Sequence, residues 1–247
     1  MQLPENPGRD FPFYNGQPIS LSGGQWLLLL GLVAGSFALL IAPIAWPGGA
    51  FGAFVPAILF PLIPLVGLSL VSRGNAGLLF GPVGWREIRS MVLFALLNIA
   101  VSMSVGGIVK VTLGATANQA VATANSLAPG ELALFLSKTA VQLVGEEVLT
   151  ILPLLALLQW LSVRNGMGRA TNVFLAWLIT AALFGAAHLP TYDWNWVQCL
   201  LVIGTARLVL SLAYIKTKNL WVSSGAHILN DWLLILMNVA GAKLLHP

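Results

Sequence analysis

Charged residues are scarce in this chain of 247 residues, where Asp, Glu, Lys and Arg together make up 8%. A soluble domain usually contains about 25% charged residues, most of them on its surface. This sequence is instead 57% hydrophobic and has a mean hydropathy of +0.86. These values exclude an ordinary soluble domain and predict an all-α, polytopic transmembrane helix bundle.

Cysteine and basic clusters are also nearly absent. The single cysteine, Cys199, excludes an internal disulfide, and its apolar surroundings predict a small buried hydrophobic side chain. The net charge is +4, but the twelve Lys and Arg residues are scattered between apolar stretches and form no basic face. We therefore expect no nucleic-acid partner, and we interpret these residues as topology signals.

Seven stretches are long enough to cross a bilayer, which takes about 20 apolar residues in a helix. They are residues 25–45, 51–72, 90–112, 132–162, 171–189, 196–215 and 221–242. The fourth is either one long tilted helix or a helix broken near Pro153, so we expect about seven to eight spans.

The distribution of Lys and Arg predicts the orientation, because cytoplasmic loops are enriched in both. With seven spans and the N-terminus inside, the outside segments hold only Lys110 and Lys243. The inside segments hold Arg9, Arg73, Arg86, Arg89, Arg164, Arg169, Lys216 and Lys218. Residues 1–24, rich in Pro and Gly, are predicted as an extramembrane lead rather than a cleaved signal peptide.

Several ionisable residues lie inside the predicted spans, where they cost at least a few kcal/mol and usually carry function. Some have structural explanations, since a lone histidine is often only hydrogen-bonded and a lysine near an interface can extend toward water. Two adjacent glutamates are harder to explain, because they point about 100° apart and cannot share one simple ion pair. The set is Lys138, Glu146, Glu147, His188, Arg207, His227 and Asp231.

Spacing brings these residues into groups. In "FGAAH", Phe184 and His188 share one helix face, and the small residues from Gly185 onward allow a neighbouring helix to come close. In "HILND", His227 and Asp231 are again four apart, so the carboxylate can orient the imidazole, and Asn230 is a supporting candidate.

This combination suits hydrolysis of an amide bond, which needs a base for water, a donor for the oxyanion and an acid for the leaving amine. Glu146 is the candidate base and Glu147 its partner. His188 and His227 would hold the oxyanion or the water, and Asp231 would fix His227. Alternatively, Glu146, His188 and His227 would bind a divalent metal such as zinc, so the cofactor stays open between none and one such ion.

Three short motifs in order, "EEVLTI" (146–151), "FGAAH" (184–188) and "HILND" (227–231), resemble those of the CPBP family of CAAX prenyl proteases and bacteriocin-processing peptidases, also called Abi. The resemblance covers residues 131–242 and implies a catalytic helical core there, with residues 25–130 as N-terminal transmembrane helices. It further implies proteolysis of peptides or proteins that are membrane-associated or lipid-modified, and in bacteria a link to bacteriocin maturation or immunity. The first Glu and both His of these motifs are the expected catalytic positions.

One position departs from the family pattern E-E-x-x-x-R, because the Arg falls on Ile151. A charge for the glutamate pair must then come from another span, and Arg207 is a better candidate than Lys138. The span boundaries raise a second difficulty, because they place His188 and His227 at different depths. Either His188 lies deeper than counted, or residues 216–226 dip into the bundle.

Three functions remain open at this level. The leading one is an intramembrane endopeptidase of the glutamate or metallo type, acting in a bilayer that is expected to be a bacterial inner membrane. An inactive relative that serves as an immunity or binding protein is favoured by Ile151. A proton-coupled transporter is compatible with membrane-embedded Glu and His residues, but no inverted repeat is present.

Overall fold

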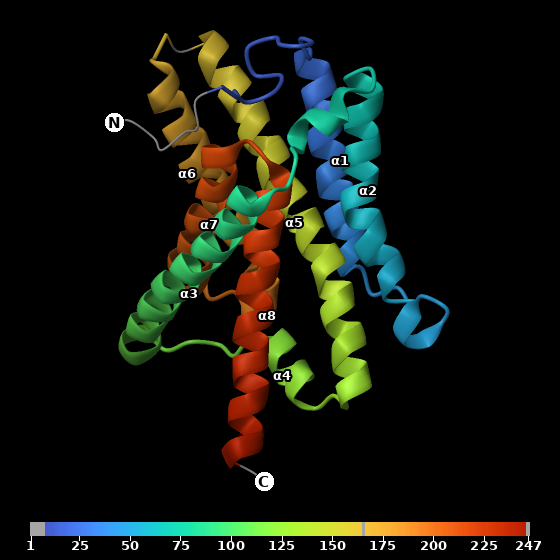
Figure 1. Cartoon of the computed structure of the whole chain (residues 1–247), viewed down its shortest axis with the longest axis vertical. Coiled ribbons are helices and arrows are strands. Elements are labelled where there is room, and N and C mark those ends of the chain that lie inside the picture. The colour runs from blue at the N-terminus through green and yellow to red at the C-terminus, as the bar shows by residue number, and fades with distance from the viewer. Residues whose placement is uncertain (1–7, 165, 246–247) are drawn as a thin grey trace.

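The computed structural model describes residues 8–164 and 166–245, which are helical and contain no strand. The 3₁₀ turns η1 (Gly49–Phe51), η2 (Asn75–Leu79) and η3 (Leu189–Tyr192) and the π-helical η4 (Gln198–Ile203) connect the main helices. Seven helical stretches of the described chain can cross a membrane, which confirms the predicted all-α bundle with seven spans. Figure 1 labels the helices, which are α1 (Gly23–Ile41), α2 (Phe54–Val71), α3 (Trp85–Leu113), α4 (Gln119–Asn125), α5 (Pro129–Arg164), α6 (Arg169–Ala187), α7 (Gly204–Thr217) and α8 (Leu220–Leu245).

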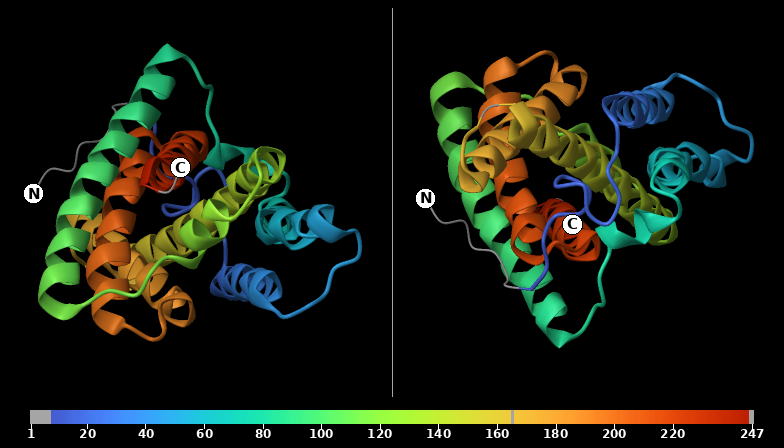
Figure 2. Two further views of the ribbon diagram at one scale, coloured as in Figure 1. Left: turned by 90° about the horizontal axis from the view of Figure 1, so that it is seen from below. Right: turned by 90° about the horizontal axis from the view of Figure 1, so that it is seen from above.

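Helix α5 forms the centre of the bundle. It packs against α1, α2, α6 and α8, while α3 packs against α7 and α8. The views of Figures 1 and 2 agree that the α1–α2 pair lies on one side of α5 and that α3 lies on the far side of α7 and α8. The most apolar window of α5 is 61% buried, against 17% for α3. Helix α5 is therefore the core of the protein, and α3 exposes most of its apolar surface.

The length of α5 settles the question of the fourth span. The helix runs for 36 residues without interruption and contains Pro153, so the alternative of a break at this proline is wrong. At 1.5 Å per residue it is about 54 Å long, well beyond the hydrocarbon thickness of about 30 Å. The helix must therefore tilt or extend past one interface.

Small residues allow α6 to approach η4 closely. A Cβ atom added to Gly185 would lie 2.5 Å from the backbone carbonyl oxygen of Cys199. Cys199 itself is fully buried. The structure thus confirms both the close approach predicted at Gly185 and the buried cysteine, and this contact fixes the end of α6 that carries His188.

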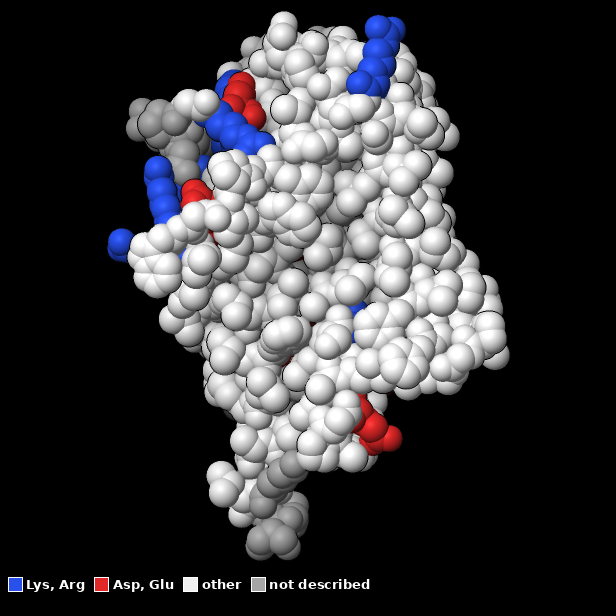
Figure 3. Space-filling model, turned by 45° about the vertical axis from the view of Figure 1, so that its right-hand side comes forward, with Lys and Arg blue, Asp and Glu red and all other residues white. Residues whose placement is uncertain are grey.

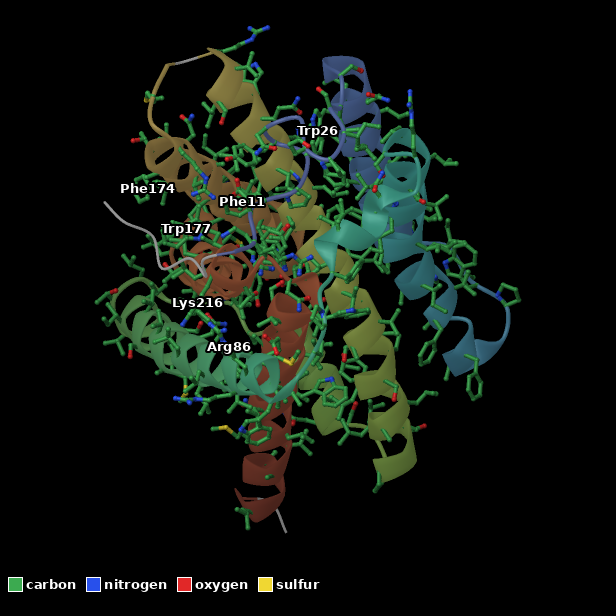
Figure 4. All side chains as sticks on the ribbon, turned by 45° about the horizontal axis from the view of Figure 1, so that its top comes forward. Phe11, Trp26, Arg86, Phe174, Trp177 and Lys216 are labelled. Atoms are coloured by element: carbon green, nitrogen blue, oxygen red, sulfur yellow. The ribbon has the colours of Figure 1, made fainter. Side chains whose placement is uncertain are left out.

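The N-terminal segment folds onto the upper end of the bundle as drawn in Figure 1. Phe11 and Phe13 are 2% and 0% exposed and belong to the main hydrophobic core. Figure 4 shows Phe11 among the helix ends, and the Lys218 ammonium lies 4.0 Å from the centre of its ring. The turn between α7 and α8 therefore lies beneath this segment.

Asp10 fastens the segment to α6. Its carboxylate lies 2.6 Å from the guanidinium of Arg169 and accepts hydrogen bonds from the Phe11 amide and the Tyr14 hydroxyl. Burial alone would raise the pKa of Asp10, but these hydrogen bonds outweigh burial and hold the pKa below its usual value. Figure 3 shows the charged side chains of one face mainly in its upper half. The orientation of the protein across the membrane stays a prediction.

Candidate active site

The adjacent glutamates of α5 lie in different environments. Glu147 is fully buried, and Glu146 is 9% exposed. Because neighbouring positions on a helix diverge by about 100°, Glu147 faces α7 and α8, whereas Glu146 faces a cavity. The two carboxylates therefore have different partners.

Glu147 is held by two cationic or potentially cationic groups. Its Oε1 atom lies 2.7 Å from Arg207 Nη2, with both side chains 0% exposed. The same oxygen lies 2.9 Å from Nδ1 of His227, which donates a hydrogen bond to it. Glu147 thus links α5 to both α7 and α8.

Arg207 is held by more than this ion pair. Its guanidinium lies 4.9 Å from the centre of the Phe184 ring on α6, and its Nε donates to the Ser211 hydroxyl at 3.2 Å. Ile151 is fully buried in the hydrophobic core, one turn after Glu147. The charge of Glu147 is accordingly met from α7, and no charged group is needed at position 151.

His227 presents its second nitrogen to the remaining two carboxylates. Nε2 lies 3.9 Å from Glu146 Oε2 and 3.8 Å from Asp231 Oδ1. Both distances are too long for direct hydrogen bonds, but one bridging water fits such a gap. The spacing predicts Asp231 as the group that fixes His227; in the structure the direct hydrogen bond of the imidazole goes to Glu147, and the role of Asp231 stays a prediction.

Asp231 lies at one end of a chain of hydrogen bonds that includes two asparagine amides. It accepts a hydrogen bond from Asn230 at 2.8 Å, and Asn98 on α3 donates to Asn230 at 3.1 Å. Asn98, which is buried, was not among the residues predicted from the sequence, although a polar amide within the apolar span 90–112 was a usable signal.

His188 lies at the C-terminal end of α6, against the cavity. Its Nδ1 lies 2.8 Å from the carbonyl oxygen of Phe184, and because a carbonyl only accepts, Nδ1 carries the proton and Nε2 is free to accept one. The Phe184 ring centre lies 4.6 Å from that of His188 and 6.4 Å from that of His227. Both imidazoles therefore lie against the same aromatic ring.

The path of the chain explains how the two histidines come together. Glu146 and the end of α5 at Arg164 are separated by the same number of residues as Ala187 and the start of α6 at Arg169. Glu146 and Ala187 therefore both lie about 27 Å from the α5–α6 turn. Figure 1 shows α6 turning back well above the lower ends of α5 and α8. The α7–α8 turn is itself buried, with Lys218 1% exposed. The two histidines thus come together both because α6 ends short of the lower ends of α5 and α8 and because the α7–α8 turn is buried in the bundle.

A cavity of about 580 Å³ leads to this site. Glu146 and His188 both line it, and Gln142 donates a hydrogen bond to Glu146 at 3.1 Å. The further lining comes from α1, α2 and the loop between them, from the start of α4 and from Lys138 on α5. In the region that the structure describes, no group of three or more His, Cys, Asp or Glu side chains is arranged to hold a metal ion, so we derive no step through one.

The comparisons with known proteins agree with this part of the chain. Residues 128–233 match the family model described as type II CAAX prenyl endopeptidase Rce1-like. No curated protein and no solved structure matches the chain. The match begins at the start of α5, ends just after Asp231 and contains all three motifs, so the resemblance drawn from those motifs is confirmed. Residues 128–233 of the chain are thus similar to the type II CAAX prenyl endopeptidases of the Rce1-like family.

Proposed function

We propose that this protein is an intramembrane endopeptidase that hydrolyses a peptide bond of a membrane-associated, lipid-modified peptide or protein with water activated by Glu146. Residues 131–242 would form its catalytic unit, and a bacterial inner membrane its location. The observation that carries the proposal is the position of Glu146, whose carboxylate lines the cavity and lies 3.9 Å from His227 Nε2. Glu147 is not assigned the role of base, because its charge is already matched by Arg207.

The proposed reaction uses the residues as follows. Glu146 takes a proton from a water molecule held between its carboxylate and His227, and the water oxygen bonds to the carbonyl carbon of the substrate. His188 lines the cavity and His227 lies beside Glu146, and in this scheme both stabilise the oxyanion or the water. When the carbon–nitrogen bond breaks, Glu146 returns the proton to the leaving nitrogen, so the products are a carboxylic acid, which keeps the second proton of the water, and an amine.

Glu147 and Arg207 act as positioning residues in this scheme. Glu147 accepts from Nδ1 of His227 and so directs Nε2 toward Glu146. Arg207 stabilises Glu147 as a carboxylate in a site that water does not reach. Asp231, which accepts a hydrogen bond from Asn230, lies near the same nitrogen of His227 as Glu146 does.

The test is cleavage of reporter peptides by purified protein in lipid vesicles. The peptides end in a CAAX sequence, with and without a prenyl group on the cysteine. Glu146→Gln removes the base and should lower kcat by at least about 100-fold, since a positioned acid–base group contributes about 10²–10⁴, and His227→Ala should also be severely impaired. Glu131→Gln, on the exposed first turn of α5, is the matched control and should cleave normally.

Equal turnover by wild type and Glu146→Gln would refute the enzyme proposal. Equal cleavage of prenylated and unmodified peptides by an active wild type would refute only the lipid requirement. Metal analysis of the same active preparation would distinguish the glutamate type from the metallo type.

A further inference from the structure

Tyr192 is a buried residue beside the cavity to which the reaction above gives no task. It is the last residue of η3, four positions after His188, and is 5% exposed. The two residues before it, Pro190 and Thr191, line the cavity together with Glu146. Tyr192 therefore lies at the edge of the space in which the proposed base works.

Asn118 fixes the direction of the hydrogen bond that holds Tyr192. Asn118 is the N-cap of α4, and its Oδ1 accepts a hydrogen bond from the amide of Ala120 at 2.8 Å. Its Nδ2 donates to the Tyr192 hydroxyl at 3.0 Å. A phenol can both accept and donate, and because its oxygen accepts here, its own proton points elsewhere. In the part of the chain that the structure describes, no hydrogen bond uses this proton.

Two carboxylates of the site lie close enough to act on this hydroxyl. Burial, together with the nearby carboxylates of Asp231 and Glu146, raises the pKa of Tyr192 to about 12. The hydroxyl therefore keeps its proton at any pH at which a glutamate can serve as the base. Asp231 also lies 3.8 Å from Nε2 of His227, where the proposed water is held. Tyr192 thus brings a protonated donor to the residues that surround this water.

We propose that Tyr192 is a further catalytic residue, whose hydroxyl donates a hydrogen bond to the carbonyl oxygen of the scissile peptide bond as that oxygen becomes negatively charged. This inference rests on the proposed peptidase function. Tyr192 transfers no proton in this scheme, because Glu146 still takes the proton from the water and returns it to the leaving nitrogen. Asn118 is a positioning residue, since its amide occupies the Tyr192 oxygen and so leaves the proton for the substrate.

The first experiment removes only the hydroxyl group. Tyr192→Phe should lower kcat about 10²–10³-fold with little change in KM, which is the usual cost of losing one donor to the oxyanion. Tyr214→Phe is the matched control, because the Tyr214 hydroxyl is fully buried in the main hydrophobic core and has no hydrogen-bond partner among the described residues. This control should cleave as wild type does. Equal kcat of Tyr192→Phe and wild type would overturn the assignment while leaving the peptidase proposal intact.

A second variant keeps the tyrosine and reverses its hydrogen bond. Asp is as good an N-cap as Asn, so Asn118→Asp should preserve the start of α4. Its carboxylate accepts but does not donate, and it should take the proton of Tyr192 away from the substrate. We expect kcat to fall at least tenfold in Asn118→Asp and to show no further loss when the same change is made in Tyr192→Phe. Additive losses in the double variant would refute the positioning role of Asn118.

A binding measurement tests Tyr192 without any turnover. The probe is a phosphinate analogue of the reporter peptide, whose tetrahedral anionic group resembles the intermediate of amide hydrolysis. Wild type should bind this probe at least tenfold more tightly than Tyr192→Phe does. Equal affinity would refute the role of Tyr192, whether or not cleavage is observed. Conversely, the expected difference in a preparation that never cleaves would leave Tyr192 as a donor to an anionic oxygen and refute only the peptidase function.

Discussion

Replacing Arg207 with methionine removes a buried charge while keeping a side chain of similar length. Arg207 and Glu147 are both 0% exposed, and their charged atoms are 2.7 Å apart. In Arg207→Met the carboxylate of Glu147 keeps its hydrogen bonds from His227 and Ser223 but loses its cationic partner. The folded protein then contains a carboxylate that is neither solvated nor neutralised.

The size of the effect follows from the asymmetry of buried ion pairs. Removing one partner of such a pair costs about 3–5 kcal/mol, whereas replacing both partners with uncharged groups is often close to neutral. For a chain of this size, 1 kcal/mol corresponds to a shift of about 2–4 °C in Tm. We therefore expect Arg207→Met to lower Tm by about 6–20 °C and Arg207→Met/Glu147→Gln to regain much of that loss.

The assay is thermal unfolding of the purified protein in detergent, with the two single variants and the double variant forming a cycle. The coupling energy should be about 2–3 kcal/mol, at the upper end for residues in contact. Arg89→Met, on the exposed side of α3, is the control and should leave Tm unchanged. A coupling below about 0.5 kcal/mol would refute the ion pair as a stabilising element, and normal turnover by Arg207→Met would refute its positioning role.

Two further predictions concern stability. Gly185→Ala should destabilise the protein by about 1–3 kcal/mol in the same unfolding assay, because the new methyl group meets the rigid Cys199 carbonyl at 2.5 Å. Gly241→Ala, with nothing within 4 Å, should be neutral or stabilising, and equal effects at both glycines would contradict the packing argument. Asp10 has a folded pKa below its unfolded value, so its contact with Arg169 should stabilise the fold above the unfolded pKa and lose this contribution as the pH falls through the folded pKa. Asp10→Asn should therefore unfold at a lower temperature than wild type at pH 7 and at nearly the same temperature near pH 2, and an unchanged difference at the two pH values would contradict the linkage.

The transmembrane helices were predictable because their signal is local. A run of about 20 apolar residues can satisfy its backbone in a bilayer only as a helix, and all seven predicted spans are found, with α5 running from residue 129 to 164. The path of residues 8–22 was not predictable in the same way. Phe11 and Phe13 enter the core because the α7–α8 turn lies low enough to leave room for them, and that depth depends on the packing of several helices.

The roles of the site residues depend on how the helices pack, which local sequence motifs do not specify. The motifs identify Glu146, Glu147 and His227 from residue type and spacing, but they do not say which glutamate faces a cation and which faces the cavity. That division depends on the rotation of α5 about its axis, which the apolar packing of neighbours such as Ile151 determines. Once Arg207 lies 2.7 Å from Glu147, the two carboxylates can no longer exchange tasks. Exchanging the two assignments would require α5 to rotate by about 100°, which would turn its buried apolar stripe out of the core.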